Sequence, residues 1–170
     1  VTPVNDAPAG ANNAVTILED GSYTFAPADF GFSDLLDSGD SLAAVKITTL
    51  PTNGFLTLGT TPITAGTEVL AADIANLRFT PAANANGSNY ANFTFQVRDS
   101  SGALNAVDPS ANTFTIDVTP VNDAPAGADK AVTILEDGSY TFDAADFGFS
   151  DIDGISNSLA AVTNTTLPTN

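Results

Sequence analysis

The stretch AVTILEDGSYTF, Ala14–Phe25, contains the pattern that decides the fold of this chain. Val15 and Ile17 alternate with polar residues, Glu-Asp-Gly follows, and Tyr23 and Phe25 then alternate with polar residues again. Apolar residues at every second position are typical of a strand with one buried face, and Asp-Gly favours a turn. The stretch therefore predicts two short strands joined by a tight turn.

The same alternation recurs along the chain, with Gly, Pro, Asn and Asp between the runs. The further apolar sets are Val45 and Ile47; Leu56 and Leu58; Leu77 and Phe79; Phe93, Phe95 and Val97; Phe114, Ile116 and Val118. No segment sustains a helical period for three turns, and only Ala71–Asn76 could form a short helical turn. Many short strands without helices predict an all-β fold, an antiparallel Greek-key β-sandwich.

The opening stretch also belongs to a long internal repeat. At a shift of 117 residues, Val1–Asn53 aligns without a gap with Val118–Asn170, and 41 of the 53 positions are identical. The differences cluster where LLDSGD (35–40) is replaced by IDGISN (152–157). A period of this length is that of a whole domain and is far longer than a solenoid repeat.

The repeat predicts the domain boundaries. We interpret residues 1–7 as a linker or the end of a preceding repeat, 8–121 as a complete β-sandwich, and 122–170 as the N-terminal part of a truncated next repeat. The two copies share one complementary half, residues 54–117, and we expect the first copy to pair with it. The alternative is a sandwich built from residues 54–170. An unpaired copy would lack partners for its apolar face unless another molecule supplied them by strand exchange.

The composition excludes several classes of function. With 20 acidic and 4 basic residues, the formal net charge is −16, which argues against nucleic acid and anionic membranes as partners. The chain has no His or Cys, which excludes disulfides, thiolate zinc sites and Ser-His-Asp triads. No apolar run approaches the ~20 residues that cross a bilayer, so no membrane insertion is expected. Nothing resembles a nucleophile elbow or a phosphate-binding loop, so we do not expect an enzyme.

The acidic residues gather in turns at strand ends. Neighbouring carboxylates repel each other unless a cation lies among them, and Ca²⁺ prefers about six to eight oxygen ligands. The segment Asp151–Asn157, with Asp153 between its ends, is the best single match, although it lacks the bidentate Glu of an EF-hand. The candidate metal ligands are Asn5, Asp6, Glu19, Asp20, Asp34, Asp37, Asp40, Asp99, Asn122, Asp123, Glu136, Asp137, Asp151, Asp153 and Asn157. The alternative is that these turns are only solvated caps, as we expect for Asp29, Asp143 and Asp146.

Six motifs spread along the chain are VTPVNDAP, EDGSYTF, FSDIDG, LPTNGFLTL, LRFTPAANANG and FTFQVRDSSGALN. Together they resemble the cadherin-like tandem repeats of giant bacterial surface adhesins of the RTX type. The resemblance implies an immunoglobulin-like or cadherin-like sandwich, with Ca²⁺ near the domain junctions stiffening a long stalk. It also implies type I secretion, an extracellular location on the bacterial cell surface, and a role in adhesion and biofilm formation.

Carried over residue by residue, the cadherin pattern groups the candidate ligands at two ends of the complete module. At the N-terminal end it joins Asn5 and Asp6 with Asp34, Asp37, Asp40 and Asp99. At the junction with the next repeat it joins Glu19 and Asp20 with Asn122, Asp123, Asp151, Asp153 and Asn157. The cadherin linker motif is only partly present, since Pro120–Ala124 lacks its first Asp and last Asn.

The resemblance and the acidic turns together predict a calcium-stiffened extender that projects a distal adhesive domain. Its partners would be the neighbouring repeats of the same chain. The alternative is a calcium-dependent adhesion domain that binds a glycan or a protein, which would need exposed aromatic platforms. The only Tyr residues are Tyr23, Tyr90 and Tyr140, and there is no Trp. Two of these Tyr alternate with Phe, so a packing role is expected for them.

Overall fold

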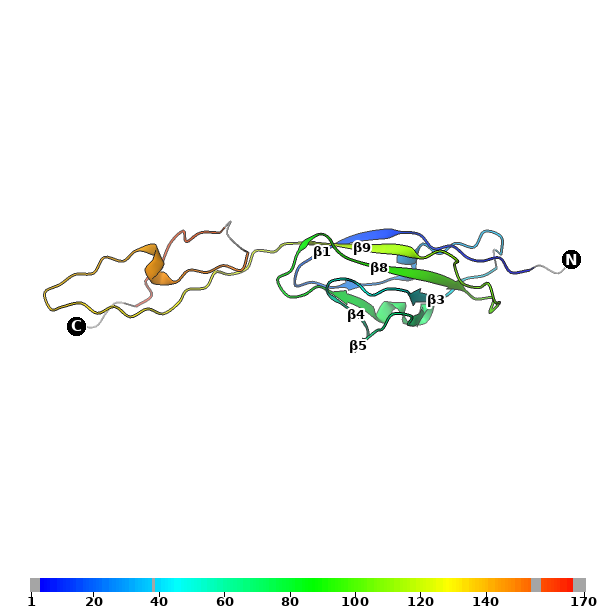
Figure 1. Cartoon of the computed structure of the whole chain (residues 1–170), viewed down its shortest axis with the longest axis horizontal. Helices are drawn as coiled ribbons and strands as arrows, with labels where there is room; N and C mark the ends of the chain where they lie inside the picture. The colour runs from blue at the N-terminus through cyan, green and yellow to red at the C-terminus, as the bar shows by residue number, and fades with distance from the viewer. Residues whose placement is uncertain (1–3, 38, 154–156, 167–170) are drawn as a thin grey trace. The chain divides into compact units, whose positions relative to one another are not determined.

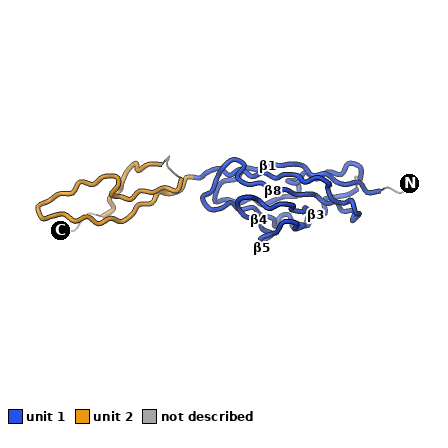
Figure 2. Tube along the Cα trace, viewed as in Figure 1, with its two compact units in different colours: residues 1–121 blue, residues 122–170 orange. Residues whose placement is uncertain are grey.

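The computed structural model describes residues 4–37, 39–153 and 157–166. The chain divides into two compact units, Val1–Val121 (unit 1) and Asn122–Asn170 (unit 2), shown in different colours in Figure 2. Among the described residues, all of the β-strands belong to unit 1, whereas unit 2 contains one short 3-10 helix, η3 (Ala144–Phe147). None of the described helices has the length and apolar character that crossing a bilayer requires.

Unit 1 is a sandwich of two β-sheets, as predicted. The five-stranded sheet has the order β1-β9-β8-β3-β6 and the four-stranded sheet the order β2-β7-β4-β5. Figure 1 labels β1, β9, β8 and β3 of the first sheet and β4 and β5 of the second. The strands are β1 (Asn13–Leu18), β2 (Tyr23–Thr24), β3 (Leu42–Ile47), β4 (Phe55–Leu58), β5 (Thr61–Pro62), β6 (Glu68–Leu70), β7 (Leu77–Thr80), β8 (Gly87–Asp99) and β9 (Asn112–Thr119). Two 3-10 helices, η1 (Pro27–Phe30) and η2 (Ala71–Asn76), complete the unit, and the second is the short helical turn that the sequence predicted.

One strand pair departs from the predicted antiparallel arrangement. β1 runs parallel to β9, with Val15 opposite Ile116 and Ile17 opposite Val118, whereas the other strand pairs of the two sheets are antiparallel. Alternation of apolar and polar residues predicts which face of a strand is buried. The same face is buried whether the strand runs parallel or antiparallel to its neighbour. The direction of β1 was therefore outside what its sequence pattern could predict.

An aromatic cluster fills the space between the sheets. Its fully or almost fully buried members are Phe25, Phe30, Phe79, Phe93, Phe95 and Phe114. The Phe114 ring lies 5.1 Å from that of Phe25 and 5.4 Å from that of Phe93, measured between ring centroids. The rings of Phe30 and Phe95 meet edge to face at 4.9 Å. Such contacts stabilise a core beyond the simple burial of apolar area.

The first copy of the repeated segment supplies β1, β2 and β3 to this sandwich, pairing with β9, β7 and β8. The second copy has the same AVTILEDGSYTF sequence at 131–142, but its described residues form no strand. A strand needs the N–H and C=O groups of a neighbouring strand as partners. Among its described residues, unit 2 has no equivalent of β8 and β9 to provide them.

Candidate metal centres

A loop between η1 and β3 holds three carboxylates of unit 1 close together. Asp34, Asp37 and Asp40 each place one oxygen so that the three atoms lie within 4.8 Å of one another. The loop is folded by its own hydrogen bonds, from the Asp37 N–H to Asp34 Oδ1 at 3.1 Å and from the Asp40 N–H to the Asp37 carbonyl at 2.9 Å. The second oxygen of Asp34, Oδ2, is buried and has no hydrogen-bond partner in the described part of the chain. A buried carboxylate oxygen without a partner is costly, and a cation would satisfy it.

Asn5 and Asp6 connect this loop to the loop that follows β8. The Asp6 N–H donates to Asp37 Oδ2 at 2.5 Å, and Asn5 Nδ2 donates to Asp99 Oδ2 at 3.3 Å. The side chain of Asn105, which sequence reasoning missed, donates to the Asn5 carbonyl. The residues predicted for the N-terminal end are therefore brought together within unit 1: Asn5, Asp6, Asp34, Asp37, Asp40 and Asp99.

Asp99 is fully buried at the end of β8. Its Oδ1 accepts hydrogen bonds from the Ser101 hydroxyl at 2.6 Å and from the Ser101 N–H at 2.8 Å. Burial raises the pKa of Asp99, but the hydrogen bonds from Ser101 and Asn5 and the positive charge of Arg98 outweigh it, so the pKa is lowered. Asp99 is therefore ionised at neutral pH and offers this end of unit 1 a fixed negative charge.

Glu19 lies just after β1 and is only 3% exposed. Asn86 Nδ2 donates to its Oε2 at 2.8 Å, and the Val121 N–H donates to its Oε1 at 2.6 Å. The hydrogen bond from Asn86, followed by that from Val121, lowers the pKa of Glu19 against the opposing effect of burial. Asp20, its predicted neighbour in the site, is exposed and has left-handed backbone geometry with φ of 63°.

Lowering the pH is expected to destabilise unit 1, in part because Glu19 becomes protonated. The pKa of Glu19 in the folded state lies below its ordinary value of 4.5, so its contribution to stability is present above about pH 4.5 and is lost as the pH falls through the folded-state pKa. Glu19→Gln should therefore flatten the pH dependence of the free energy of unfolding below about pH 5. Urea unfolding followed by circular dichroism at a series of pH values measures this. Glu68→Gln, at a side chain 43% exposed, is the matched control, and an unchanged slope in Glu19→Gln would contradict the assignment.

Unit 2 gathers five of the predicted ligands at its own beginning: Asn122, Asp123, Asp151, Asp153 and Asn157. Asp153 Oδ2 accepts the Asp123 N–H at 2.7 Å and an amide hydrogen of Asn157 at 3.5 Å, and the Asp153 N–H donates to Asp151 Oδ1 at 3.0 Å. The intervening residues 154–156 lie outside the described part of the chain. The predicted grouping of Glu19 and Asp20 with these residues stays a prediction.

One hydrogen bond recurs in the described residues of the two copies, although the residue that accepts it is shifted. Asp153 accepts the N–H of Asp123 as Asp37 accepts the N–H of Asp6. In the alignment, however, Asp153 stands opposite Leu36 and not opposite Asp37. The remaining two candidates, Glu136 and Asp137, lie in an exposed turn, where Asp137 repeats the left-handed backbone of Asp20 with φ of 61°.

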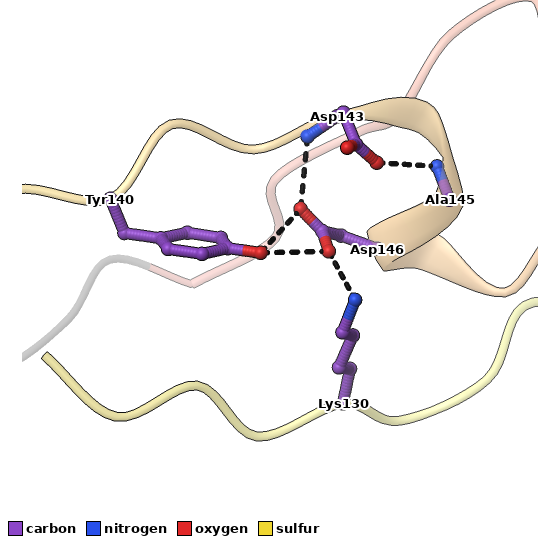
Figure 3. A network of polar contacts seen from close by, with 5 residues as sticks. All are labelled: Lys130, Tyr140, Asp143, Ala145 and Asp146. Carbon is purple, nitrogen blue, oxygen red and sulfur yellow. Dashed lines mark hydrogen bonds and ion pairs between the residues drawn. The ribbon is translucent and has the colours of Figure 1, made fainter.

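The acids of the two ADF segments make local capping interactions, as predicted. Asp29 and Asp146 each accept the backbone N–H three residues earlier, at 2.7 and 2.9 Å. Figure 3 shows that Asp146 also accepts from the Tyr140 hydroxyl and pairs with the Lys130 ammonium. The hydrogen bond from Lys130 is the main cause that lowers the pKa of Asp146 to about 2. Asp143 accepts an N–H of η3 and so caps that helix.

Sequence reasoning missed Asp108, which is 4% exposed in the connection between β8 and β9. Its carboxylate accepts three hydrogen bonds, each of 2.8 Å, from the Gly10 N–H, the Ser110 N–H and Asn112 Nδ2. It thereby ties the N-terminal segment to this connection. An Asp directly before Pro is a turn signal, and this signal could have identified it.

Comparison with known proteins gives one further finding. The family model described as "Bacterial Ig domain" matches residues 5–119, a range that includes all the described strands of unit 1, β1 to β9. A search of curated proteins and a search of solved structures each gave no match.

Proposed function

The chain belongs to the bacterial Ig domain family, and on that premise we propose that it is a calcium-stiffened extender module of a large bacterial surface adhesin. Bacterial Ig-like domains are usually extracellular or exposed at the surface, and their fold is typically non-catalytic. The internal repeat supports a role that depends on tandem copies, since a spacer gains length from every copy. In this proposal the module holds a distal adhesive domain away from the cell.

The observation that carries the calcium part of the proposal is the unpartnered Oδ2 of Asp34 beside the carboxylates of Asp37 and Asp40. Carboxylate oxygens together with the Asn5 amide and backbone carbonyls are the ligands that a hard cation such as Ca²⁺ prefers. Few positively charged side chains are available to neutralise these carboxylates, because the whole chain has only 4 Lys and Arg residues against 20 Asp and Glu residues. The repulsion among these acids would therefore be relieved by metal ions.

Calcium is expected to stabilise unit 1 against heat. A cation that binds the folded state alone adds about 2.7 kcal/mol when its free concentration is 100 times its Kd. We expect the Tm to rise between EDTA and millimolar Ca²⁺, measured by scanning calorimetry, and to rise much less with Mg²⁺. The variant Asp34→Asn/Asp37→Asn should lose the calcium response, whereas Asp73→Asn, in η2, should keep it. A Tm that is identical in EDTA and in saturating Ca²⁺ would refute calcium binding.

Stiffening is tested separately by the distance between spin labels on the two units. The chain contains no Cys, so Thr60→Cys and Ser139→Cys, both at exposed positions, provide unique labelling sites. Motion between linked domains is the normal expectation, so a broad distance distribution is expected in EDTA. Saturating Ca²⁺ should narrow this distribution of distances between the two spin labels. Equal widths in the two conditions would refute stiffening, even if the Tm responded to calcium.

The alternative, a glycan-binding adhesion domain, gains no support from Tyr23 or Tyr90. The Tyr23 ring packs edge to face on Phe25 at 5.0 Å, and its hydroxyl donates to Asp29. Burial, together with Asp29, raises the pKa of Tyr23 to about 12. The Tyr90 hydroxyl accepts the Ala82 N–H at 3.1 Å. Both side chains thus have structural roles, and we do not advance this second function.

A further inference from the structure

Unit 2 retains the local geometry of the first repeat copy. The rings of Phe142 and Phe147 lie 5.9 Å apart at 31°, and their counterparts Phe25 and Phe30 lie 5.8 Å apart at 25°. The bridge between Ala126 and Ser150 repeats the one between Ala9 and Ser33, and the left-handed Gly148 repeats Gly31 with φ of 54° against 56°. Unit 2 therefore holds its aromatic residues in the arrangement that unit 1 uses in its core.

No strand of the described part of unit 2 covers the face that presents these residues. Phe142 is 61% exposed where Phe25 is 2% exposed, and Val162 is 49% exposed where Val45 is fully buried. A hollow of about 350 Å³ opens on the same unit, and Phe147, Phe149, Leu159 and Val162 are among the residues that line it. Apolar side chains gathered around an open hollow mark an interaction surface.

Unit 1 shows what covers the equivalent face. Phe25 packs against Phe93 of β8 and Phe114 of β9, at 5.7 and 5.1 Å between ring centroids. Phe30 packs against Phe95 of β8 at 4.9 Å. β3 also hydrogen-bonds along β8, with Val45 opposite Val97. All of the covering residues come from the half of the repeat that follows Asn53.

We propose that unit 2 is a preformed acceptor for a polypeptide with the sequence of Gly54–Thr119, which completes a second sandwich on it. The 41 of 53 identical positions mean that this polypeptide meets nearly the same surface that it covers in unit 1. On docking, residues 130–135 would pair with the equivalent of β9 and residues 159–164 with the equivalent of β8. The two segments would then become strands, as their counterparts β1 and β3 are.

One substitution between the copies predicts how tightly the partner binds. Ile47 is fully buried at the end of β3, opposite Phe95. The corresponding residue of unit 2 is Asn164, which is exposed in the unpaired unit. Docking would bury this amide at an apolar position, which costs free energy. Asn164→Ile should therefore tighten binding by about tenfold or more.

The test uses the full chain, labelled with ¹⁵N, and a separate unlabelled Gly54–Thr119 polypeptide as the probe, in EDTA so that metal plays no part. We expect saturable 1:1 binding by calorimetry and new protection from hydrogen exchange at residues 130–135 and 159–164. Phe142→Asp should abolish binding, Asn164→Ile should strengthen it, and the probe with Phe95→Asp should not bind. In unit 1, residues 54–119 belong to the same chain as residues 1–53 and therefore act on them at a high effective concentration. The probe should not displace them, so the protection of residues 13–18 from hydrogen exchange should not change.

Three results would overturn the proposal: no binding, binding that is insensitive to Phe142→Asp, or binding that exchanges residues 1–53 out of unit 1. If the probe aggregates, a chain with Gly54–Thr119 fused after Asn170 replaces it. The fused chain should show a second cooperative unfolding transition with a native dispersion of amide resonances for residues 130–135. A single transition, with these amides unprotected, would equally refute the proposal.

Discussion

Phe25→Ala should lower the free energy of unfolding of unit 1 by about 3–5 kcal/mol. The Phe25 ring is 2% exposed and contacts four other aromatic rings, those of Tyr23, Phe30, Phe93 and Phe114, at centroid distances of 5.0 to 5.8 Å. Its removal leaves a cavity between two sheets whose backbones are fixed by hydrogen bonds and cannot close around it. Urea unfolding of the full chain, followed by circular dichroism, measures the loss.

The chain offers a matched control for this prediction in its second copy. Phe142 stands in the same local sequence, GSYTF, but its side chain is 61% exposed. Phe142→Ala should therefore change the free energy of unfolding of unit 1 by no more than about 0.5 kcal/mol. Equal losses at the two positions would show that packing in unit 1 is not the cause.

Asp108→Ala should cost about 3 kcal/mol of stability. The substitution removes a charged acceptor and leaves the donors of Gly10, Ser110 and Asn112 without the partner to which each is bonded at 2.8 Å. Hydrogen bonds to charged groups contribute more than neutral ones, and unsatisfied buried donors add a desolvation cost. Chemical unfolding at neutral pH is the measurement.

Asp108→Asn separates the loss of acceptors from the loss of size. Asn has nearly the shape of Asp, but its amide nitrogen is a donor and would face a donor of the protein at one of the two oxygen positions. We therefore expect Asp108→Asn to cost most of what Asp108→Ala costs. Stability close to that of the original chain in Asp108→Asn would mean that the carboxylate acts by filling space.

Most of the candidate metal ligands at the N-terminal end of unit 1 could be predicted from the sequence, because turns have a recognisable local composition. Asp34, Asp37 and Asp40 stand in one short loop, and a loop of seven residues brings such groups together whatever surrounds it. Their partners across space were harder to predict. Asn105 reaches Asn5, and Asn86 reaches Glu19, from positions 100 and 67 residues away. Contacts at that separation depend on how the strands are ordered in the sheets, which local patterns do not contain.

The two copies of AVTILEDGSYTF separate the contribution of sequence from that of tertiary structure. In both copies the sequence alone determines the tight turn after Leu18 or Leu135, the left-handed Asp20 or Asp137, and the 3-10 helix that follows, because these features are closed by contacts among near neighbours. The strand is different. Residues 13–18 form β1, whereas the aligned residues 130–135 form no strand. An isolated strand cannot satisfy its own N–H and C=O groups or bury its own apolar face, so only the presence of β9 beside the first copy made it a strand.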